Sequence, residues 1–301
     1  MFLVAPESSG ARACDSALKT HPVSYFPTAI ISDLHGNIQA LHCAIRDALE
    51  RGAQRFVCLG DVVGYGAKPC ESLDIVMQLC SETEPSVPAG ILRGGEGPYP
   101  LQPGLCLQGN HEHALLNSAE DFNPKARSAI EWTKDALNGH SDRDKKFAFW
   151  DFLDEIESRR TDELALFAHG SPRDPVREYM LPRDIRNSDK MEANFAAMDR
   201  NVCFVGHSHV PAIYYEGGRI FQPQGVDGPY DLGVSAENKA IINVGSVGQP
   251  RDGDPRLSYV IFDGTNVTFV RVEYEHELAM ADIRAVPELP DFLAARLAEG
   301  R

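Results

Sequence analysis

The chain has 301 residues, of which 43% are hydrophobic and 24% are charged, a composition typical of a globular protein with a large core. Its net charge of −15 argues against a broad electrostatic surface for nucleic acid or anionic membranes. No run approaches the roughly 20 apolar residues that a membrane-spanning helix needs, and the first residues lack the pattern of a signal peptide. The seven cysteines form no CxxC pair, which favours buried, reduced thiols and a cytoplasmic protein.

Residues 1–27 show no clear periodicity and are interpreted as an extension of the folded domain. An apolar run at 28–31 predicts a buried strand, and apolar residues at helical spacing predict a helix over 38–51 that ends before Gly52. A second apolar run predicts a strand at 55–59. Strand, helix and strand in this order predict a right-handed βαβ unit, whose parallel strands end at the same edge of the sheet.

Pro69 begins another predicted helix, and a long connection rich in proline and glycine follows at 81–104. Connections of this length inside a compact domain are often lids or binding loops. Arg93, Glu96 and Tyr99 lie within it. The connection is therefore a candidate for lining or covering a functional site and for setting substrate preference.

The rest of the chain alternates first between strands and helices and then among strands alone. Strands are predicted at 105–107, 164–168 and 202–205, and helices at 124–137 and 143–153. Short alternating runs with turn signals at 212–272 predict a meandering sheet rather than further βαβ units. We therefore predict one domain over 28–275, followed by a helical tail over 276–301 that packs on it.

Polar residues able to bind metals follow the predicted strands at five places. They are Asp33, His35, Asp61, Asn110, His111, His169, His207 and His209. Asp33 and His35 are two residues apart, so extended backbone would point both side chains the same way. A carboxylate and an imidazole at one point suit Mn²⁺, iron or Zn²⁺ better than Ca²⁺. Taken alone, each block is also explained as a turn or as a histidine whose hydrogen bonds are satisfied. A sheet edge with only a structural role, however, would not need such residues after every strand.

The order of these blocks resembles that of the calcineurin-like metallophosphoesterases. The matching blocks are Asp-x-His, Gly-Asp, Gly-Asn-His-Glu, a lone His and Gly-His-Ser-His, and the resemblance covers roughly residues 28–272. It implies an α/β fold, a four-layer α-β-β-α sandwich of two mixed sheets flanked by helices. It also implies a site that holds two metal ions bridged by a carboxylate, with manganese, iron, zinc or nickel as the candidate ions.

The resemblance further assigns roles to the candidate residues. It implies three ligands for each metal: Asp33, His35 and His209 for the first, and Asn110, His169 and His207 for the second. Asp61 would bridge the two ions, and His111 would be an acid near the leaving group. Two cations about 3.5–4 Å apart can clamp phosphate oxygens and generate a hydroxide nucleophile at neutral pH, while an imidazolium can protonate the departing alkoxide.

Departures from the family pattern help to choose among its branches. Ser/Thr protein phosphatases carry an Asp-Arg pair after the second block, where this chain has Gly64 and Tyr65. Three segments, at 63–66, 169–173 and 243–251, instead resemble small prokaryotic phosphodiesterases, in which a similar Asn-x-Gly-Ser turn lies beside the site. Arg173 and Arg251 are the cations best placed in sequence to bind substrate phosphate, although each is also explained as a surface salt bridge.

We therefore predict a metal-dependent phosphodiesterase that acts on a small or nucleotide-like phosphoester. A Ser/Thr-type protein phosphatase or a phosphomonoesterase is the alternative within the family. A non-catalytic scaffold of the same fold is the alternative of another class, although that interpretation requires degraded ligands. Nucleic acid and membranes are not expected as partners, because no Lys/Arg cluster with interleaved aromatics occurs.

Overall fold

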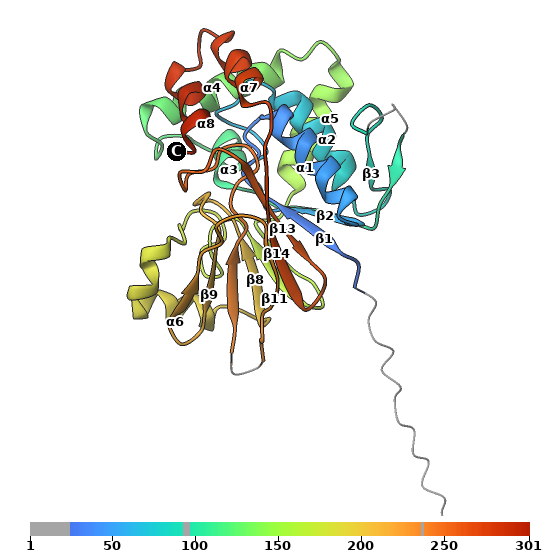
Figure 1. Cartoon of the computed structure of the whole chain (residues 1–301). Helices are drawn as coiled ribbons and strands as arrows, with labels where there is room; N and C mark the ends of the chain where they lie inside the picture. The colour runs from blue at the N-terminus through green and yellow to red at the C-terminus, as the bar shows by residue number, and fades with distance from the viewer. Residues whose placement is uncertain (1–24, 93–96, 236–237) are drawn as a thin grey trace, which may run out of the picture.

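The computed structural model describes residues 25–92, 97–235 and 238–301, and its core is a pair of six-stranded sheets (Figure 1). Most of the predicted N-terminal extension, together with Arg93 and Glu96, lies outside the described residues. Within the part that is described, no helix is both long and apolar enough to cross a membrane.

The first sheet is mixed. Its strands are β1 (Thr28–Ile31), β2 (Arg55–Cys58), β5 (Leu105–Cys106), β11 (Asp227–Asp231), β13 (Leu257–Phe262) and β14 (Asn266–Val272). They are ordered β11–β14–β13–β1–β2–β5, and β1, β2 and β5 run parallel. The helix between β1 and β2 is α1 (Ile38–Glu50), so the predicted βαβ unit is confirmed.

The second sheet is also mixed. Its strands are β6 (Arg159–Thr161), β7 (Ala165–Ala168), β8 (Val202–Val205), β9 (Ala212–Tyr215), β10 (Arg219–Phe221) and β12 (Ala240–Asn243). They are ordered β10–β9–β12–β8–β7–β6, with β7, β8 and β12 parallel. A separate two-stranded sheet pairs β3 (Ser86–Val87) with β4 (Tyr99–Pro100).

Helices cover the outer faces of both sheets. The remaining helices are α2 (Pro69–Leu79), α3 (Asn110–Leu116), α4 (Pro124–Asn138), α5 (Arg143–Glu155), the 3₁₀ helix η1 (Pro182–Arg186), α6 (Ser188–Ala196), α7 (His276–Arg284) and α8 (Asp291–Glu299). One apolar cluster joins α1 and α2 to the first sheet, and another joins α6 to the second. The order of layers is thus helix, sheet, sheet, helix, and the predicted fold class is confirmed.

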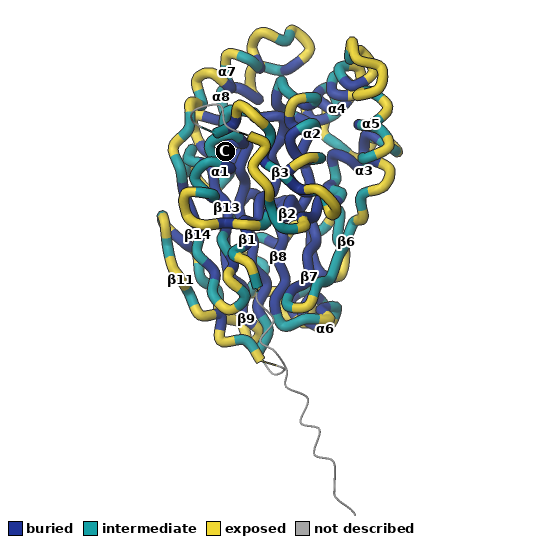
Figure 2. Tube along the Cα trace, turned by 90° about the vertical axis from the view of Figure 1, so that its right-hand side faces the viewer, coloured by how far each residue is buried: buried dark blue, intermediate teal, exposed yellow. Residues whose placement is uncertain are grey.

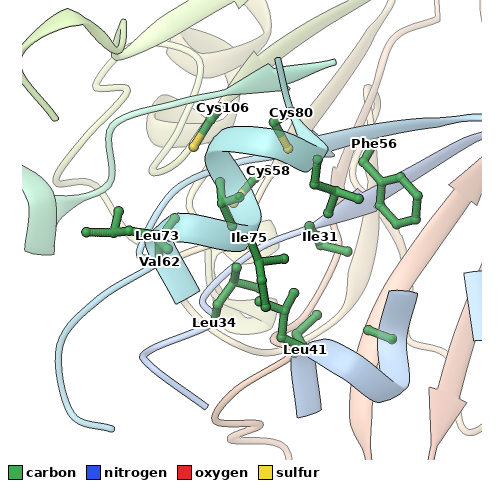
Figure 3. Close-up of a cluster of buried hydrophobic side chains, with 14 of the residues drawn as sticks. Ile31, Leu34, Leu41, Phe56, Cys58, Val62, Leu73, Ile75, Cys80 and Cys106 are labelled. Carbon is green, nitrogen blue, oxygen red and sulfur yellow. The ribbon is translucent and has the colours of Figure 1, made fainter. Parts of the chain in front are cut away.

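Alternation along the strands divides the core into layers. In β1, Ala29 and Ile31 belong to the cluster under α1 and α2, whereas Ile30 belongs to the cluster between the two sheets. Figure 3 shows side chains of the first cluster, with Ile31 near Phe56 of β2, and with Ile75 and Leu73 of α2 to their left. Between the sheets, the rings of Phe204 and Phe262 lie 5.1 Å apart. Each such fully buried side chain stabilises the fold by about 1.5–3 kcal/mol, and Figure 2 shows this buried layer running through the centre.

Helix α1 follows directly from its sequence. Its buried residues Ala40, Leu41, Ala44, Ile45 and Ala48 recur at helical spacing and form one apolar face. The side chain of Asn37 caps the start of the helix by accepting from the Ala40 N–H at 3.1 Å. Past the end, Gly52 adopts φ +87°, which a residue with a side chain would rarely do.

The structure differs from the sequence predictions in the partners of the strands at 212–272, in short helices that were not predicted, and in the connection at 81–104. The strands at 212–272 do not form one meander, because β9, β10 and β12 join the second sheet and β11, β13 and β14 join the first. Helix α3 begins at Asn110, where only the end of a strand was predicted. Its seven residues are too few to show a helical period. Helix α6 and η1 were not predicted either.

The third difference concerns the connection at 81–104, whose described part lies away from the carboxyl ends of the strands. Gln102 donates its N–H to Gln54 O just before β2, and Gly104 donates to Ser81 O just after α2. Both contacts are at the amino ends of the parallel strands, because α2 runs back across the sheet before β5 begins. The prediction that this segment lines the site is therefore wrong for its described residues, Tyr99 included.

Candidate metal centre

Eight polar side chains gather at the carboxyl ends of β1, β2, β7 and β8 and at the start of α3. They are Asp33, His35, Asp61, Asn110, His111, His169, His207 and His209. Apart from Asn110, these residues are at most 3% exposed. Polar groups buried to this extent require partners, since each unsatisfied one costs about 1–3 kcal/mol.

The backbone at this edge is held in an unusual conformation. Among the described residues, positive φ angles outside glycine occur at Asp33, His35, Asp61, Tyr65, His207 and His209, with values from 48° to 63°. This left-handed conformation costs roughly 1–2 kcal/mol per residue with a side chain. Backbone hydrogen bonds hold it in place, for example from Asp33 N to Gly60 O at 3.0 Å and from His35 N to Asp61 O at 2.9 Å.

One group of donors comprises Asp33, His35, Asp61 and His209. His35 Nδ1 lies 3.1 Å from Val63 O, and His209 Nδ1 lies 2.5 Å from Gln249 O, so both rings direct Nε2 inward. The two Nε2 atoms are 3.3 Å apart, and His209 Nε2 is 3.1 Å from Asp33 Oδ1. One ligand atom from each of the four residues lies within 4.8 Å of the others.

A second group adjoins the first and shares Asp61 with it. His169 Nε2 lies 3.1 Å from Asn110 Oδ1 and 3.0 Å from His207 Nδ1. His207 directs its other nitrogen, Nε2, at Arg177 O, 3.2 Å away. Asp61 Oδ2 is 3.5 Å from His169 Nε2 and 3.7 Å from His35 Nε2, so this carboxylate lies between the two groups.

The electrostatics of these donors fit metal ions. Burial lowers the pKa of His35 and His209 below its ordinary value and lowers the pKa of His169 to about 4, so the rings are neutral near pH 7. Burial alone would raise the pKa of Asp33, but the interactions with His209 first, and then with His169 and His35, outweigh it and hold that pKa well below its usual range. Converging lone pairs of neutral imidazoles and carboxylates repel one another unless cations lie between them. Oxygen and nitrogen donors suit manganese, iron or zinc.

His111 lies beside these donors, in the first turn of α3. Its Nε2 is 3.9 Å from Asp61 Oδ2, and its ring packs edge-on against Tyr65 and Phe122, with centroids 4.5 Å and 5.2 Å away. Its Nδ1 faces Gly64 and has no hydrogen-bond partner in the described structure. Burial, followed by the charge of Arg251, lowers the pKa of His111 well below its ordinary value.

Glu112 supports the ligand loops, and sequence reasoning gave it no role. Its Oε2 accepts the N–H groups of Asp61 at 2.8 Å and Gly109 at 2.9 Å, while its Oε1 accepts the N–H of Val63 at 3.2 Å. One buried carboxylate thus fixes the loop after β2 and the start of α3. The Gly-Asn-His-Glu block was the signal, because a Glu three residues after a helix cap commonly binds the cap backbone.

The turn after β12 supports the loops after β1 and β8. Asn243 donates from Nδ2 to Gly206 O at 2.7 Å, and Ser246 donates from Oγ to Asp33 O at 2.9 Å. The Asn-Val-Gly-Ser turn therefore ties the strand ends that carry His207 and Asp33.

The two predicted phosphate-binding arginines have different surroundings. Arg173 is 40% exposed and forms an ion pair with Glu178 at 2.5 Å, and the structure does not bring it into the cluster of donors. Arg251 lies at the cluster, where it donates its N–H to His209 O at 3.2 Å and its Nη2 to Gln249 Oε1 at 2.8 Å. Its Nε is buried and has no hydrogen-bond partner within the described structure.

A pocket of about 240 Å³ opens beside the second group of donors. The residues that line it include Asn110 and His207 of the second group, together with Tyr65, Phe122, Arg177 and Tyr179. The Tyr179 ring stacks on His207 with centroids 3.7 Å apart. Sequence reasoning gave no binding role to Phe122, Arg177 or Tyr179, because they lie in loops without a recognisable motif.

Residues 27–266 match the family model described as a calcineurin-like phosphoesterase superfamily domain. The chain belongs to this superfamily. The predicted family is therefore confirmed, and the His and Asp clusters described above could hold its dinuclear metal site.

Individual relatives agree with this assignment. An uncharacterised protein of Methanocaldococcus jannaschii is 33% identical over 279 residues, which cover 91% of this chain and 98% of that protein. A crystal structure of a metallophosphoesterase from Sphaerobacter thermophilus is 34% identical, with a TM-score of 0.71 over 92% of this chain and all of that one. A hypothetical protein of Pyrococcus horikoshii shares the fold at 17% identity, with a TM-score of 0.67 over 91% of this chain and 98% of its own.

Proposed function

We propose that this protein is a two-metal phosphoesterase that hydrolyses a small phosphodiester, with nucleotide-like compounds as the first substrates to examine. The observation that carries the proposal is the pair of adjoining donor groups that share Asp61. Asp33, His35 and His209 would hold one ion, Asn110, His169 and His207 the other, and Asp61 both. Manganese and iron are the ions we propose first, followed by zinc and nickel.

Two ions bound in this way would polarise the phosphoryl oxygens and lower the pKa of a bound water to near neutrality. The chain's own residues would do the rest. The oxygen of water adds to phosphorus, the ester P–O bond breaks, and the leaving oxygen takes up a proton. His111 presents Nε2 next to Asp61, so we assign that atom to the proton destined for the leaving oxygen. Tyr65 and Phe122 hold the ring in place.

The preference for a small diester rests on the surroundings of the centre. The pocket beside Asn110 and His207 has room for one modest leaving group between aromatic side chains. Gly64 and Tyr65 replace the Asp-Arg pair of protein phosphatases, and a side chain at position 64 would collide with His111, because a Cβ there would lie 2.0 Å from its Nδ1. The alternative activity is that of a protein phosphatase or a phosphomonoesterase. The alternative of another class is a non-catalytic scaffold of the same fold.

Hydrolysis of bis-p-nitrophenyl phosphate and p-nitrophenyl phosphate, measured side by side with Mn²⁺ and with EDTA, tests the proposal. We expect metal-dependent turnover that favours the diester and is largely lost in His111→Ala. Preference for the monoester would redirect the search to phosphatase substrates. Absence of turnover with every candidate ion, despite bound metal, would support the scaffold instead.

A further inference from the structure

The pocket beside the second group of donors combines aromatic rings with hydrogen-bonding side chains. Three rings and three polar side chains line it together with two residues of that donor group. They are Tyr65, Phe122, Tyr179, His113, Asp121 and Arg177. Apolar walls with a few placed polar groups are typical of sites for small molecules, and a flat, polar heterocycle uses both kinds of contact.

Tyr179 offers an aromatic face to this pocket. One face of its ring stacks on His207, with centroids 3.7 Å apart and the planes inclined by 21°. Tyr179 is nevertheless 44% exposed, so the opposite face is open to a ligand. Phe122 lines the same pocket, and its ring lies 5.2 Å from that of His111, the residue assigned to the leaving oxygen. A group held in this pocket therefore lies on the side of the leaving oxygen.

Asp121 and Arg177 place a carboxylate and a guanidinium side by side in the pocket. They form an ion pair at 3.2 Å between the loop that joins α3 to α4 and the segment that follows β7. The Arg177 N–H donates to Asp174 Oδ1 at 3.0 Å, and its carbonyl oxygen lies 3.2 Å from His207 Nε2. Its Nη2 lies 3.3 Å from His113 Nε2. These contacts fix the pair relative to the second group of donors.

We propose that this pocket binds the base of the nucleoside that leaves from the phosphodiester, and that Asp121 and Arg177 select guanine. The inference rests on the proposed function and narrows its substrate class to guanine nucleotide diesters. The base stacks on the open face of Tyr179. Its O6 accepts from the Arg177 guanidinium, while its N1–H and its N2 amino group donate to the two oxygens of Asp121.

The order of donors and acceptors separates guanine from the other bases. On its pairing edge guanine has one acceptor followed by two donors, which matches a guanidinium beside a carboxylate with two oxygens. Adenine, cytosine and thymine each have only one donor group on that edge, so one oxygen of Asp121 would receive nothing from the base. Stacking on an aromatic ring is open to every base. Tyr179 therefore supplies affinity, and Asp121 supplies the choice of base.

Hydrolysis of such a diester needs only water. The oxygen of one water adds to phosphorus, the bond from phosphorus to the 5′ oxygen of the leaving nucleoside breaks, and that oxygen leaves with a proton. The dinucleotide d(GpG) would thus give deoxyguanosine and deoxyguanosine 3′-phosphate.

The test compares d(GpG), d(ApA) and d(TpT), which differ only in their bases and have no 2′-hydroxyl group to attack phosphorus. Wild type, Asp121→Asn, Tyr179→Ala and Tyr179→Phe are loaded with Mn²⁺ and assayed on all three and on bis-p-nitrophenyl phosphate. Glu120→Gln is the matched control, because it removes a charge next to Asp121 from a residue that does not line the pocket. Saturation-transfer NMR with deoxyguanosine and deoxyadenosine measures base binding without phosphate or turnover. Metal analysis of each variant shows whether the centre is intact.

We expect wild type to prefer d(GpG) by about tenfold in kcat/KM over the other dinucleotides. The factor is moderate because Asp121 and Arg177 are largely exposed to solvent. Asp121→Asn should lose this preference and retain its activity on bis-p-nitrophenyl phosphate. Tyr179→Ala should lose deoxyguanosine binding, and Tyr179→Phe should keep it. Glu120→Gln should match wild type, and metal content should be equal in all variants.

Two results would overturn the inference while the proposed function stands. The first is hydrolysis of bis-p-nitrophenyl phosphate by a wild type that neither cleaves d(GpG) nor binds deoxyguanosine. The second is a wild type that cleaves the three dinucleotides equally well, or a preference for guanine that persists in Asp121→Asn. A wild type inactive on every ester would count against the proposed function, and the NMR measurement alone would then decide whether the pocket binds guanine.

Discussion

The two ends of the sheets make their tight turns in different ways. At the carboxyl ends of the parallel strands, residues with side chains adopt the left-handed conformation, among them Asp33, Asp61 and His207. At the opposite end, glycines do so, as at Gly52 and Gly217, where a Cβ would meet nothing within 4 Å. The turns at the opposite end therefore use glycine, the residue that adopts the left-handed conformation at the lowest cost in free energy.

This difference shows where backbone strain is retained. The left-handed conformation at Asp33 or His207 lowers stability, yet glycine would remove the side chain that reaches the centre. Strain of this kind persists where surrounding structure enforces it, and here Glu112, Asn243 and Ser246 supply the hydrogen bonds. Four predictions, from the largest expected effect to the smallest, test whether the two ends differ in this way.

Asp61→Asn should have the largest effect. The variant keeps the size of the side chain but removes the charge that lies between the two donor groups. We expect metal content to fall and kcat/KM for bis-p-nitrophenyl phosphate to drop by more than about a hundredfold. This loss is larger than the one expected from removing a residue that only hydrogen-bonds to a metal ligand. Metal analysis and steady-state kinetics measure both. Asp263→Asn is the control, because Asp263 holds the β13–β14 turn at the opposite end by accepting the Asn266 N–H at 2.7 Å. Full metal content and activity in Asp61→Asn would contradict the proposal that the metal ions bind at Asp61.

Gly64→Ala and Gly217→Ala form a matched pair across the comparison. The two glycines have φ of +86° and +92°, so an alanine at either position carries a similar backbone cost of about 1–2 kcal/mol. Only at Gly64 does the new Cβ collide with His111, whose Nδ1 would be 2.0 Å away. We expect about a hundredfold loss of kcat in Gly64→Ala, because a misplacement of about 1 Å can have that effect.

Gly217→Ala should lose only stability, in both thermal melts and denaturant titrations. Comparable kcat values in the two variants would show that the position of the His111 ring does not limit turnover.

The sequence predicted the class of fold, and it predicted which polar residues would gather at one edge of the sheets. The gathering could be predicted because Asp33, His35 and the Gly-His-Ser-His block are local motifs at the ends of apolar strands, and parallel strands bring such ends to one edge. The split of residues 212–272 between two sheets was missed because alternation predicts strands but not their partners.

Metal removal should act on one end of the sheets only. If ions offset the repulsion among donors, chelation will lower the free energy of unfolding by about 1.4 kcal/mol for each ion whose free concentration had been ten times its Kd. The melting temperature should fall by about 3–6 °C for each such ion. Hydrogen exchange should accelerate in the loops that carry His35 and His209, but not in the turn at Gly217 and Gly218. Uniform acceleration at both ends would contradict a stabilisation confined to the carboxyl ends.

The smallest effect is expected from the ion pair of Arg173 and Glu178, which fastens the loop after β7 without backbone strain. Partial burial would raise the pKa of Glu178 from its ordinary value of 4.5, but hydrogen bonds from Arg173, Asn194 and Ser171 outweigh it and lower that pKa to about 2. A carboxyl group with a depressed pKa stabilises the folded state fully above pH 4.5, and that contribution disappears as the pH falls toward 2. Glu178→Gln should therefore be less stable than wild type at pH 7 by up to about 1 kcal/mol, a value limited by solvent screening. Urea titrations at pH values from 4.5 down to 2 should show the difference in stability between wild type and Glu178→Gln shrinking.

Arg173→Gln removes the other partner of this ion pair. If Arg173 only stabilises the loop, the variant should lose the same stability and keep the wild-type KM for bis-p-nitrophenyl phosphate. A raised KM would instead support Arg173 as a phosphate-binding residue.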